Sequence, residues 1–351
     1  MLKQELLSQK DLIERRGGVV VQAGTNPSPF EITEGIKTIS GSDLTIATAT
    51  EQDVRLGKTF YAGSPELKTG SANMDAESFH HVFMYNQTSQ TYEDDIYYTC
   101  PDHLLVIKAN MFEYNYNKVT MTFNQELVTI SEYAFRNAKN FSFNNFSNLT
   151  KLTRVGQYAF AGTGCNGIDF GMLPNCLARI DTYAFENGIK DNQSLKFPDS
   201  LSSLGQYAFR QSTRKFLNSF DASTCKLTSL SAYACYNLAF NCDFIVPTQV
   251  TSVLNQFNYN GCFRNIVIHA SAKVSDGAFG GSSSRPLSDF FLQTVVCESE
   301  TPPFLGSTVF AEQNISNGFK IYVPDNAVEE YKASTYLTKY VNCIYPMSQK
   351  E

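Results

Sequence analysis

Apolar residues along this chain return to the same pattern about every 25 residues. The most regular part is an apolar anchor, two variable positions and the triplet Tyr-Ala-Phe, as in "VGQYAF" at 155–160. The anchors lie 25, 25, 24 and 26 residues apart: Ile130, Val155, Ile180, Leu204 and Leu230. A period of this length in a chain of 351 residues predicts an array of stacked repeats.

Each repeat also carries two short segments of strand-forming residues. The first ends at the anchor, as in "LTRV" at 152–155. The second segments are "MTF" 121–123, "FSF" 141–143, "IDF" 168–170, "LKF" 195–197, "NSF" 218–220, "FIV" 244–246 and "IVI" 266–268. Two short strands cannot bury an apolar face alone, but coils stacked about 4.8 Å apart bond through their backbones and share a continuous core. The pattern therefore predicts a mainly β solenoid of the leucine-rich-repeat type.

The aromatic residues of the triplet recur at the same depth in every coil, where the stack needs a bulky side chain. We expect the phenylalanine to point inward, and the tyrosine to pack its ring with the hydroxyl at the edge. An aromatic ligand box is the alternative, and the regular spacing favours a scaffold. The predicted ladder comprises Tyr133, Phe135, Tyr158, Phe160, Tyr183, Phe185, Tyr207, Phe209, Tyr233 and Phe279.

The triplet and the segments around it resemble the BspA-like leucine-rich repeat. "LKFPDSLSSLGQYAF" at 195–209 carries the likeness most fully, and the resemblance covers roughly 119–300. The segments "TPPFLGSTVF" at 301–310 and "KIYVPDNAVEEYKASTYLTKYVNCIYP" at 320–346 resemble the closing part that follows such repeats. This resemblance implies an α/β cap: a strand, Asp325 as the N-cap of a helix over about 326–338, and a last strand.

The N-terminal region has a different character. Residues 1–16 have the apolar spacing of a short amphipathic helix, and 57–71 predict a small β-hairpin. "LIERRGG" at 12–18, "GIKTI" at 35–39 and "DVRLGKTFYAGSPELKTGS" at 53–71 together resemble the N-terminal modules of phage and prophage tail proteins. Arg16, where lysine is usual, and Phe60 depart from that pattern without disrupting it.

We therefore expect four parts in the chain. They are a helix and tail-like attachment module (1–72), a β-rich connector or N-terminal cap (73–118), the repeats (119–300) and a C-terminal cap (301–351). The predicted fold class is a mainly β solenoid of about 25-residue coils, with a small N-terminal region of helix plus β and an α/β C-terminal cap.

Composition and charge exclude several classes of partner. The net charge is −6 and no run of Lys or Arg occurs, which argues against a nucleic-acid-binding surface. No apolar run approaches the roughly 20 residues of a membrane-spanning helix, so we expect no membrane insertion. Residues 1–16 are charged throughout and lack the apolar core of a secretory signal peptide.

The chain offers few candidates for chemistry. Nine cysteines form no C-x-x-C pair, and Cys235 replaces the phenylalanine of one triplet, so we expect reduced core thiols. The four histidines lack the spacing of a zinc site. The acidic run Glu93-Asp94-Asp95 is adjacent in sequence, whereas a glycosidase needs two facing carboxylates about 5–10 Å apart. We expect no metal, no cofactor and no enzymatic activity.

One surface invites a binding hypothesis. The two residues before each anchor are mostly polar, and one of each pair should point outward. The candidate receptor-binding face consists of Thr153, Arg154, Arg179, Ser203, Thr228 and Thr251. Such a face could bind a glycan, although a solvated face without a ligand is the simpler interpretation.

Two functional hypotheses follow. The first is a non-enzymatic tail-fibre or receptor-binding protein of a phage or phage-like particle. It would be located in the virion and released by lysis, with the N-terminal region bound to other tail or baseplate proteins. The second is a bacterial surface adhesin of the BspA-like type. The lack of a secretory signal favours the first. In both hypotheses the solenoid binds a protein or glycan on a host cell surface. The resemblance to tail proteins further implies a homo-oligomer, namely a trimer.

Overall fold

A computed structural model describes residues 96–100, 104–269, 272–279, 292–306, 308–310 and 316–350, together with one strand pair near the N-terminus. The chain divides into two compact units, Met1–Asp75 and Ala76–Glu351. In the first unit, β1 (Thr59–Phe60) pairs antiparallel with β2 (Lys68–Thr69), which confirms the two strands of the expected hairpin. The predicted helix 1–16 and the segments 12–18 and 35–39 lie outside the described residues.

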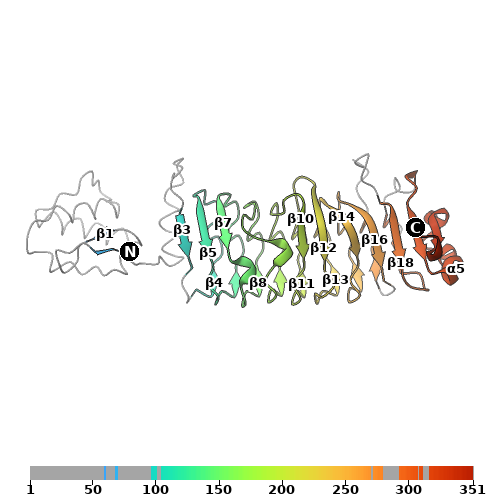
Figure 1. The fold of residues 1–351 in the computed structure, drawn as a ribbon, viewed down its shortest axis with the longest axis horizontal. Helices are drawn as coiled ribbons and strands as arrows, with labels where there is room; N and C mark the ends of the chain where they lie inside the picture. The colour runs from blue at the N-terminus through green and yellow to red at the C-terminus, as the bar shows by residue number, and fades with distance from the viewer. Residues whose placement is uncertain are drawn as a thin grey trace, which may run out of the picture. The chain divides into compact units, whose positions relative to one another are not determined.

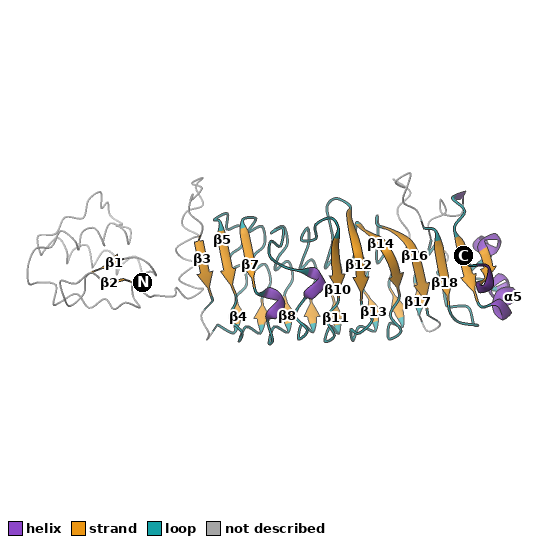
Figure 2. Ribbon diagram, viewed as in Figure 1, coloured by secondary structure: helices purple, strands orange, loops and turns teal. Residues whose placement is uncertain are grey.

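The second unit is a stack of coils with parallel strands on two sides of the solenoid (Figures 1 and 2). On the long-strand side lie β3 (Ile96–Thr99), β5 (Val119–Thr122), β7 (Phe141–Asn144), β10 (Gln193–Lys196), β12 (Lys215–Asp221), β14 (Leu238–Ile245), β16 (Cys262–Ile268), β18 (Thr294–Cys297), β19 (Lys320–Val323) and β20 (Ile344–Pro346). On the short-strand side lie β4 (Val106–Ile107), β6 (Thr129–Ile130), β8 (Arg154–Val155), β9 (Arg179–Ile180), β11 (Ser203–Leu204), β13 (Ser229–Leu230), β15 (Ser252–Val253) and β17 (Lys273–Val274).

All described strand pairs in this unit are parallel, because each coil runs in the same direction as the one before it. Ile130 pairs with Val155, and Val155 pairs with Ile180. This register repeats the spacing of the sequence anchors and confirms the predicted solenoid. The strands β3 and β4 extend the same two-sided geometry to residues before 119.

The core lies between the two sides and is built from rows of equivalent residues. The anchors are buried along the stack: Ile107, Ile130, Val155, Ile180, Leu204, Leu230, Val253 and Val274. Beside them the phenylalanine rings stack almost face to face, with 5.2 Å between the ring centroids of Phe135 and Phe160 and 5.4 Å between Phe160 and Phe185. The row continues with a centroid distance of 5.6 Å between Phe185 and Phe209. Further along the stack, Phe279 is buried and stacks on Phe310.

The tyrosine of each triplet lies in a turn with a left-handed backbone. Tyr133, Tyr158, Tyr183, Tyr207 and Tyr233 all have φ between 54° and 58°. That conformation costs a residue with a side chain roughly 1–2 kcal/mol. It is held by backbone bonds to the next coil, such as Tyr133 N–H to the Gln157 carbonyl at 2.8 Å, and by ring stacking at 4.6–5.2 Å. These half-buried rings form a second aromatic row at the edge of the core.

One predicted strand is wrong. Residues 168–170 do not pair as a strand, and Phe170–Met172 form a 3₁₀ turn instead. The preceding loop contains Gly162, Gly164 and Gly167, all with positive φ, and the Asp169 carboxylate accepts the N–H of Gly171 at 2.8 Å, which starts the turn. Phe170 nevertheless remains buried against Phe185, with 5.3 Å between ring centroids. The turn therefore keeps the core row intact while the backbone leaves the sheet.

The C-terminal cap has the predicted α/β character with a shorter helix. The strands β18, β19 and β20 continue the long-strand sheet, and the helix α5 spans only Val328–Ala333, because Ser334 takes an extended backbone. Asp325 is not an N-cap, which corrects the prediction. Its carboxylate accepts the N–H of Ser348 at 2.9 Å, and this bond lowers the pKa of the Asp325 carboxyl.

The cysteines lie among the apolar residues of the stack. All nine are free thiols, six of them buried and three partly buried. Burial raises the pKa of the Cys100, Cys165 and Cys297 thiols to about 12 and also raises that of Cys235. These thiols remain protonated at neutral pH and pack as small apolar side chains, as the sequence predicted.

Replacing one ring of the phenylalanine row tests whether it supports the fold. Phe160 is fully buried and contacts Phe135, Phe143 and Phe185, so we expect Phe160→Ala to lower the free energy of unfolding by about 3–5 kcal/mol. Urea titration followed by circular dichroism measures the change. Met172→Ala is the control, because Met172 is 63% exposed and its loss should cost less than about 0.5 kcal/mol. Equal stability of the two variants would contradict a scaffold role for the phenylalanine row.

Candidate functional site

The short strands present one regular row of side chains to solvent. Each of these short strands is two residues long: the first residue faces outward and the second is the buried anchor. Arg154 pairs in register with Arg179, and Arg179 with Ser203. These three candidates therefore lie side by side on consecutive strands of one parallel sheet, about 4.8 Å apart from strand to strand.

The other three candidates lie one position earlier in their coils. Thr153 precedes β8, whereas Thr228 and Thr251 precede β13 and β15 in the separate three-stranded sheet. The hydroxyl of Thr153 donates to the Val128 carbonyl at 3.3 Å, and the hydroxyl of Thr251 donates to the Thr228 carbonyl at 3.2 Å. The structure thus separates the six candidates into two rows, one at the first position of a short strand and one at the position before it.

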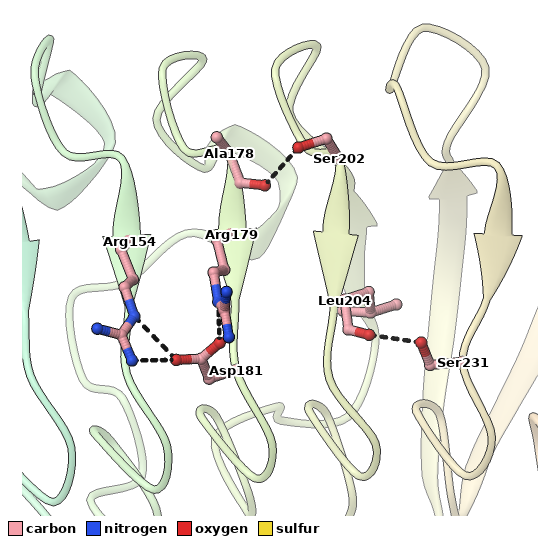
Figure 3. A network of polar contacts seen from close by, with 7 residues as sticks. All are labelled: Arg154, Ala178, Arg179, Asp181, Ser202, Leu204 and Ser231. Atoms are coloured by element: carbon pink, nitrogen blue, oxygen red, sulfur yellow. Dashed lines mark hydrogen bonds and ion pairs between the residues drawn. The ribbon is translucent and has the colours of Figure 1, made fainter.

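Asp181 joins the two arginines of the first row (Figure 3). Its Oδ2 accepts from Nε and Nη2 of Arg154 at 2.9 and 2.8 Å, and its Oδ1 accepts from Nε of Arg179 at 2.5 Å. The Asp181 side chain is only 11% exposed, whereas those of Arg154 and Arg179 are 42% and 57% exposed. The carboxylate therefore holds both guanidinium groups from beneath while their outer edges face solvent.

Glycines occupy the position equivalent to Asp181 in the coils on either side of it. The position after the anchor is occupied in successive coils by Ser131, Gly156, Asp181, Gly205 and Ser231. A Cβ added to Gly205 would lie 2.3 Å from the Thr182 nitrogen and 2.4 Å from the Asp181 carbonyl carbon. A Cβ added to Gly156 would meet the backbone of Ser131 at 2.6 Å. At Gly156 and Gly205, therefore, the backbones of successive coils approach too closely to leave room for a side chain.

The sequence interpretation missed Asp181, although a signal for it exists. The other four coils carry serine or glycine at that position, so an acid stands out once the repeats are aligned on their anchors. The register also adds members to the outward row. Thr129 pairs with Arg154 on the five-stranded sheet, and Ser229, Ser252 and Lys273 form the equivalent row on the three-stranded sheet.

The charge balance of the arginine pair is uneven. Two guanidinium groups share one carboxylate, which leaves one positive charge. The two positions that flank the pair in the same row, Thr129 and Ser203, are uncharged. Within the described part of the chain, Nη1 of Arg154 and both Nη atoms of Arg179 have no protein acceptor. Asp181, Arg154 and Arg179, here called the arginine cluster, thus form a site with oriented donors and a surplus of positive charge.

Among the residues that the structure describes, the other candidates for chemistry form no site. Glu93, Asp94, Asp95 and three of the histidines lie outside the described residues. His269 is described, and its Nδ1 lies 2.7 Å from an Oε2 of Glu298. Among the described residues, no three His, Cys, Asp or Glu side chains gather into a group that could hold a metal ion. Nor does any helix in the described ranges have the length and apolarity to span a bilayer.

Removing the charge of Asp181 should loosen the arginine cluster. In Asp181→Asn the side chain keeps its size, but it loses its charge and presents an N–H group to two donors. We expect the free energy of unfolding to fall by about 1–2 kcal/mol, a limit set by the exposure of both arginines. Thermal or urea unfolding measures this loss. Glu132→Gln removes one exposed negative charge elsewhere and should change stability by less than about 0.5 kcal/mol. A stable Asp181→Asn would mean that the carboxylate does not hold the arginines.

Comparisons with known proteins agree with the geometry of the coils. The sequence matches the BspA type Leucine rich repeat region, with six copies, over residues 93–190 and 157–285. The match begins at residue 93, and the resemblance of 12–71 to tail modules stays a prediction. No curated protein matches the sequence.

Two solved structures are similar to parts of the chain. A leucine rich cell surface protein from Faecalibacterium prausnitzii A2-165 is 20% identical over 60% of this chain and 63% of its own, with a TM-score of 0.31. A leucine-rich repeat protein from Bacteroides ovatus ATCC 8483 is 14% identical over 68% of this chain and 74% of its own, with a TM-score of 0.34. The chain thus covers less than two thirds of the first of these proteins. Because the family match spans residues 93–285, more than half of the sequence, this chain belongs to the BspA-type leucine-rich repeat family.

Proposed function

We propose that this chain is a non-catalytic binding protein displayed at a cell surface, where its short-strand side contacts a protein or glycan of another cell. The observation that carries the proposal is the register of Arg154, Arg179 and Ser203, which stand at successive exposed positions of one sheet. Binding by a repeat protein depends on such a surface, since stacked repeats create extended faces.

The construction of this face supports a role in recognition. The backbones of consecutive coils are bonded to each other, as in the bond from Thr153 N–H to the Val128 carbonyl at 2.9 Å. The outward residues are therefore held at fixed spacing by elements that do not depend on their identity. The core rows keep similar residues from coil to coil, whereas the outward row changes from Thr129 to Arg154, Arg179 and Ser203. Differences between coils can thus set binding specificity.

The tail-fibre hypothesis differs from this proposal in where the solenoid is displayed, on a phage or phage-like particle instead of on a cell. It rests on the resemblance to tail modules of residues 12–71, a segment outside the family match. The trimer and the baseplate partners of that hypothesis rest on the same resemblance. Family membership, in contrast, rests on the repeats themselves. For this reason we propose display on the cell and make attachment to a particle the competing outcome of the test.

Immunogold electron microscopy separates the two locations. We expect antibodies raised against the full chain to label the envelope of intact cells of the organism that encodes it. Particles pelleted from a lysate of the same culture should carry no label above that of a strain with the gene deleted. Label confined to tail-like particles would overturn surface display and establish the tail-fibre hypothesis. Label confined to the cell interior would overturn both.

A further inference from the structure

We propose that the arginine cluster is an anion subsite that binds a carboxylate or sulfate group of an acidic glycan. The inference rests on the proposed function, because it names the class of ligand for the same face. It comes from the combination of two guanidinium groups in register, one buried carboxylate that binds both, and the hydroxyl residues Thr129 and Ser203 at the flanking positions of the row.

The donors are already oriented for an oxyanion. Asp181 fixes Arg154 through Nε and Nη2 and Arg179 through Nε, so the side chains do not have to be ordered when a ligand arrives. The planar guanidinium fork matches the geometry of carboxylate and sulfate oxygens. The remaining donors, Nη1 of Arg154 and both Nη atoms of Arg179, belong to the half-exposed ends of the two side chains. A single arginine would neutralise Asp181, and the second provides the surplus charge for a ligand.

The residues around the cluster favour a sugar. Ser202 donates its hydroxyl to the Ala178 carbonyl at 3.3 Å, and Thr153 donates to the Val128 carbonyl in the same way (Figure 3 shows the Ser202 bond). With their protons engaged, these hydroxyls keep free lone pairs and act as acceptors toward solvent. Ser203 adds an exposed hydroxyl in register with Arg179. Acceptors at the start of these strands and an anion subsite at their end (Figure 3) complement an extended ligand that carries many hydroxyl donors and an acidic group.

An acidic peptide fits this place less well. Extended peptides commonly bind by adding a strand to the edge of a sheet. The strands β8 and β9 have neighbours on both sides in the five-stranded sheet, in the order β11-β9-β8-β6-β4, so their backbone groups are already paired. A peptide would have to lie flat on polar side chains without main-chain bonds. A glycan needs only side-chain contacts, and we therefore assign the subsite to a glycan.

Binding of purified full-length chain to immobilised polymers tests the assignment. The polymers are a polyuronate, a sulfated dextran, neutral dextran and polyglutamate, measured by biolayer interferometry at physiological salt. We expect binding to at least one acidic polysaccharide, weakening as salt is raised, and no comparable binding to neutral dextran or polyglutamate. The polyuronate and sulfated arms distinguish a carboxylate from a sulfate as the bound group.

Arg179→Gln is the decisive variant. It removes the more exposed guanidinium and leaves the two bonds between Arg154 and Asp181, so the variant should fold like the wild type by circular dichroism. We expect its dissociation constant for the acidic polysaccharide to rise by about tenfold or more. Lys139→Gln changes the net charge by the same amount in an exposed turn after a Tyr-Ala-Phe triplet, and its dissociation constant should stay within about twofold of the wild type.

Three results would overturn the subsite. They are equal binding of neutral and acidic polysaccharides, equal affinities of wild type and Arg179→Gln, and binding of polyglutamate as tight as that of the acidic polysaccharide. The last result would assign the cluster to an acidic protein partner. If immunogold labels the cell surface and any of these three binding results is obtained, the proposed function stands and only the assignment of an acidic glycan as ligand is lost. Failure of the labelling, with glycan binding that depends on Arg179, would instead retain the subsite and overturn surface display.

Discussion

The hydrogen bonding between successive coils sets the conditions for every side chain in this solenoid. Parallel strands lie about 4.8 Å apart, so equivalent residues of neighbouring coils are held close to van der Waals contact. Flat aromatic rings suit that spacing, and the tyrosine rings lie 4.6–5.2 Å apart while the phenylalanine rings lie 5.0–5.6 Å apart. The repeated triplet is thus a consequence of the stacking distance. Its tyrosine also accepts a left-handed backbone because the turn is bonded to the next coil.

The same spacing constrains the polar surface. Like charges in register on adjacent strands repel each other, and a stable face needs complementary neighbours. The long-strand side shows such pairs: Ser219 donates its hydroxyl to that of Ser194 at 2.7 Å, and the Asn265 amide donates to the Asp243 carboxylate at 2.7 Å. Arg154 beside Arg179 breaks this rule, and Asp181 compensates for it from an adjacent position. A like-charged pair maintained by a dedicated carboxylate is an arrangement that stacking alone does not require.

The sequence predicted the parts of the structure that repeat. Anchor spacing gave the coil period, the register and the buried rows, because each coil places the same constraint on equivalent residues. It failed where one coil departs from the others. The segment 168–170 has strand-forming residues, but the glycine-rich loop before it shifts the backbone into a 3₁₀ turn. Asp325 has the residue type of an N-cap, but Ser348, distant in sequence, takes up its carboxylate. In both cases a contact specific to one place outweighed a local propensity.

On the candidate face, too, the repeat period predicted some residues, and others depend on a feature of one coil. Periodicity identified Arg154, Arg179 and Ser203 as exposed neighbours, since these follow from counting residues to the anchor. Asp181 follows from no period: the adjacent coils have glycine at the equivalent position, and its carboxylate binds arginines in two different coils. A change at an outward position leaves the core rows untouched, so each coil can alter the surface chemistry independently. Recognition in such a fold is therefore expected at positions where one coil breaks the pattern, and the arginine cluster is such a position.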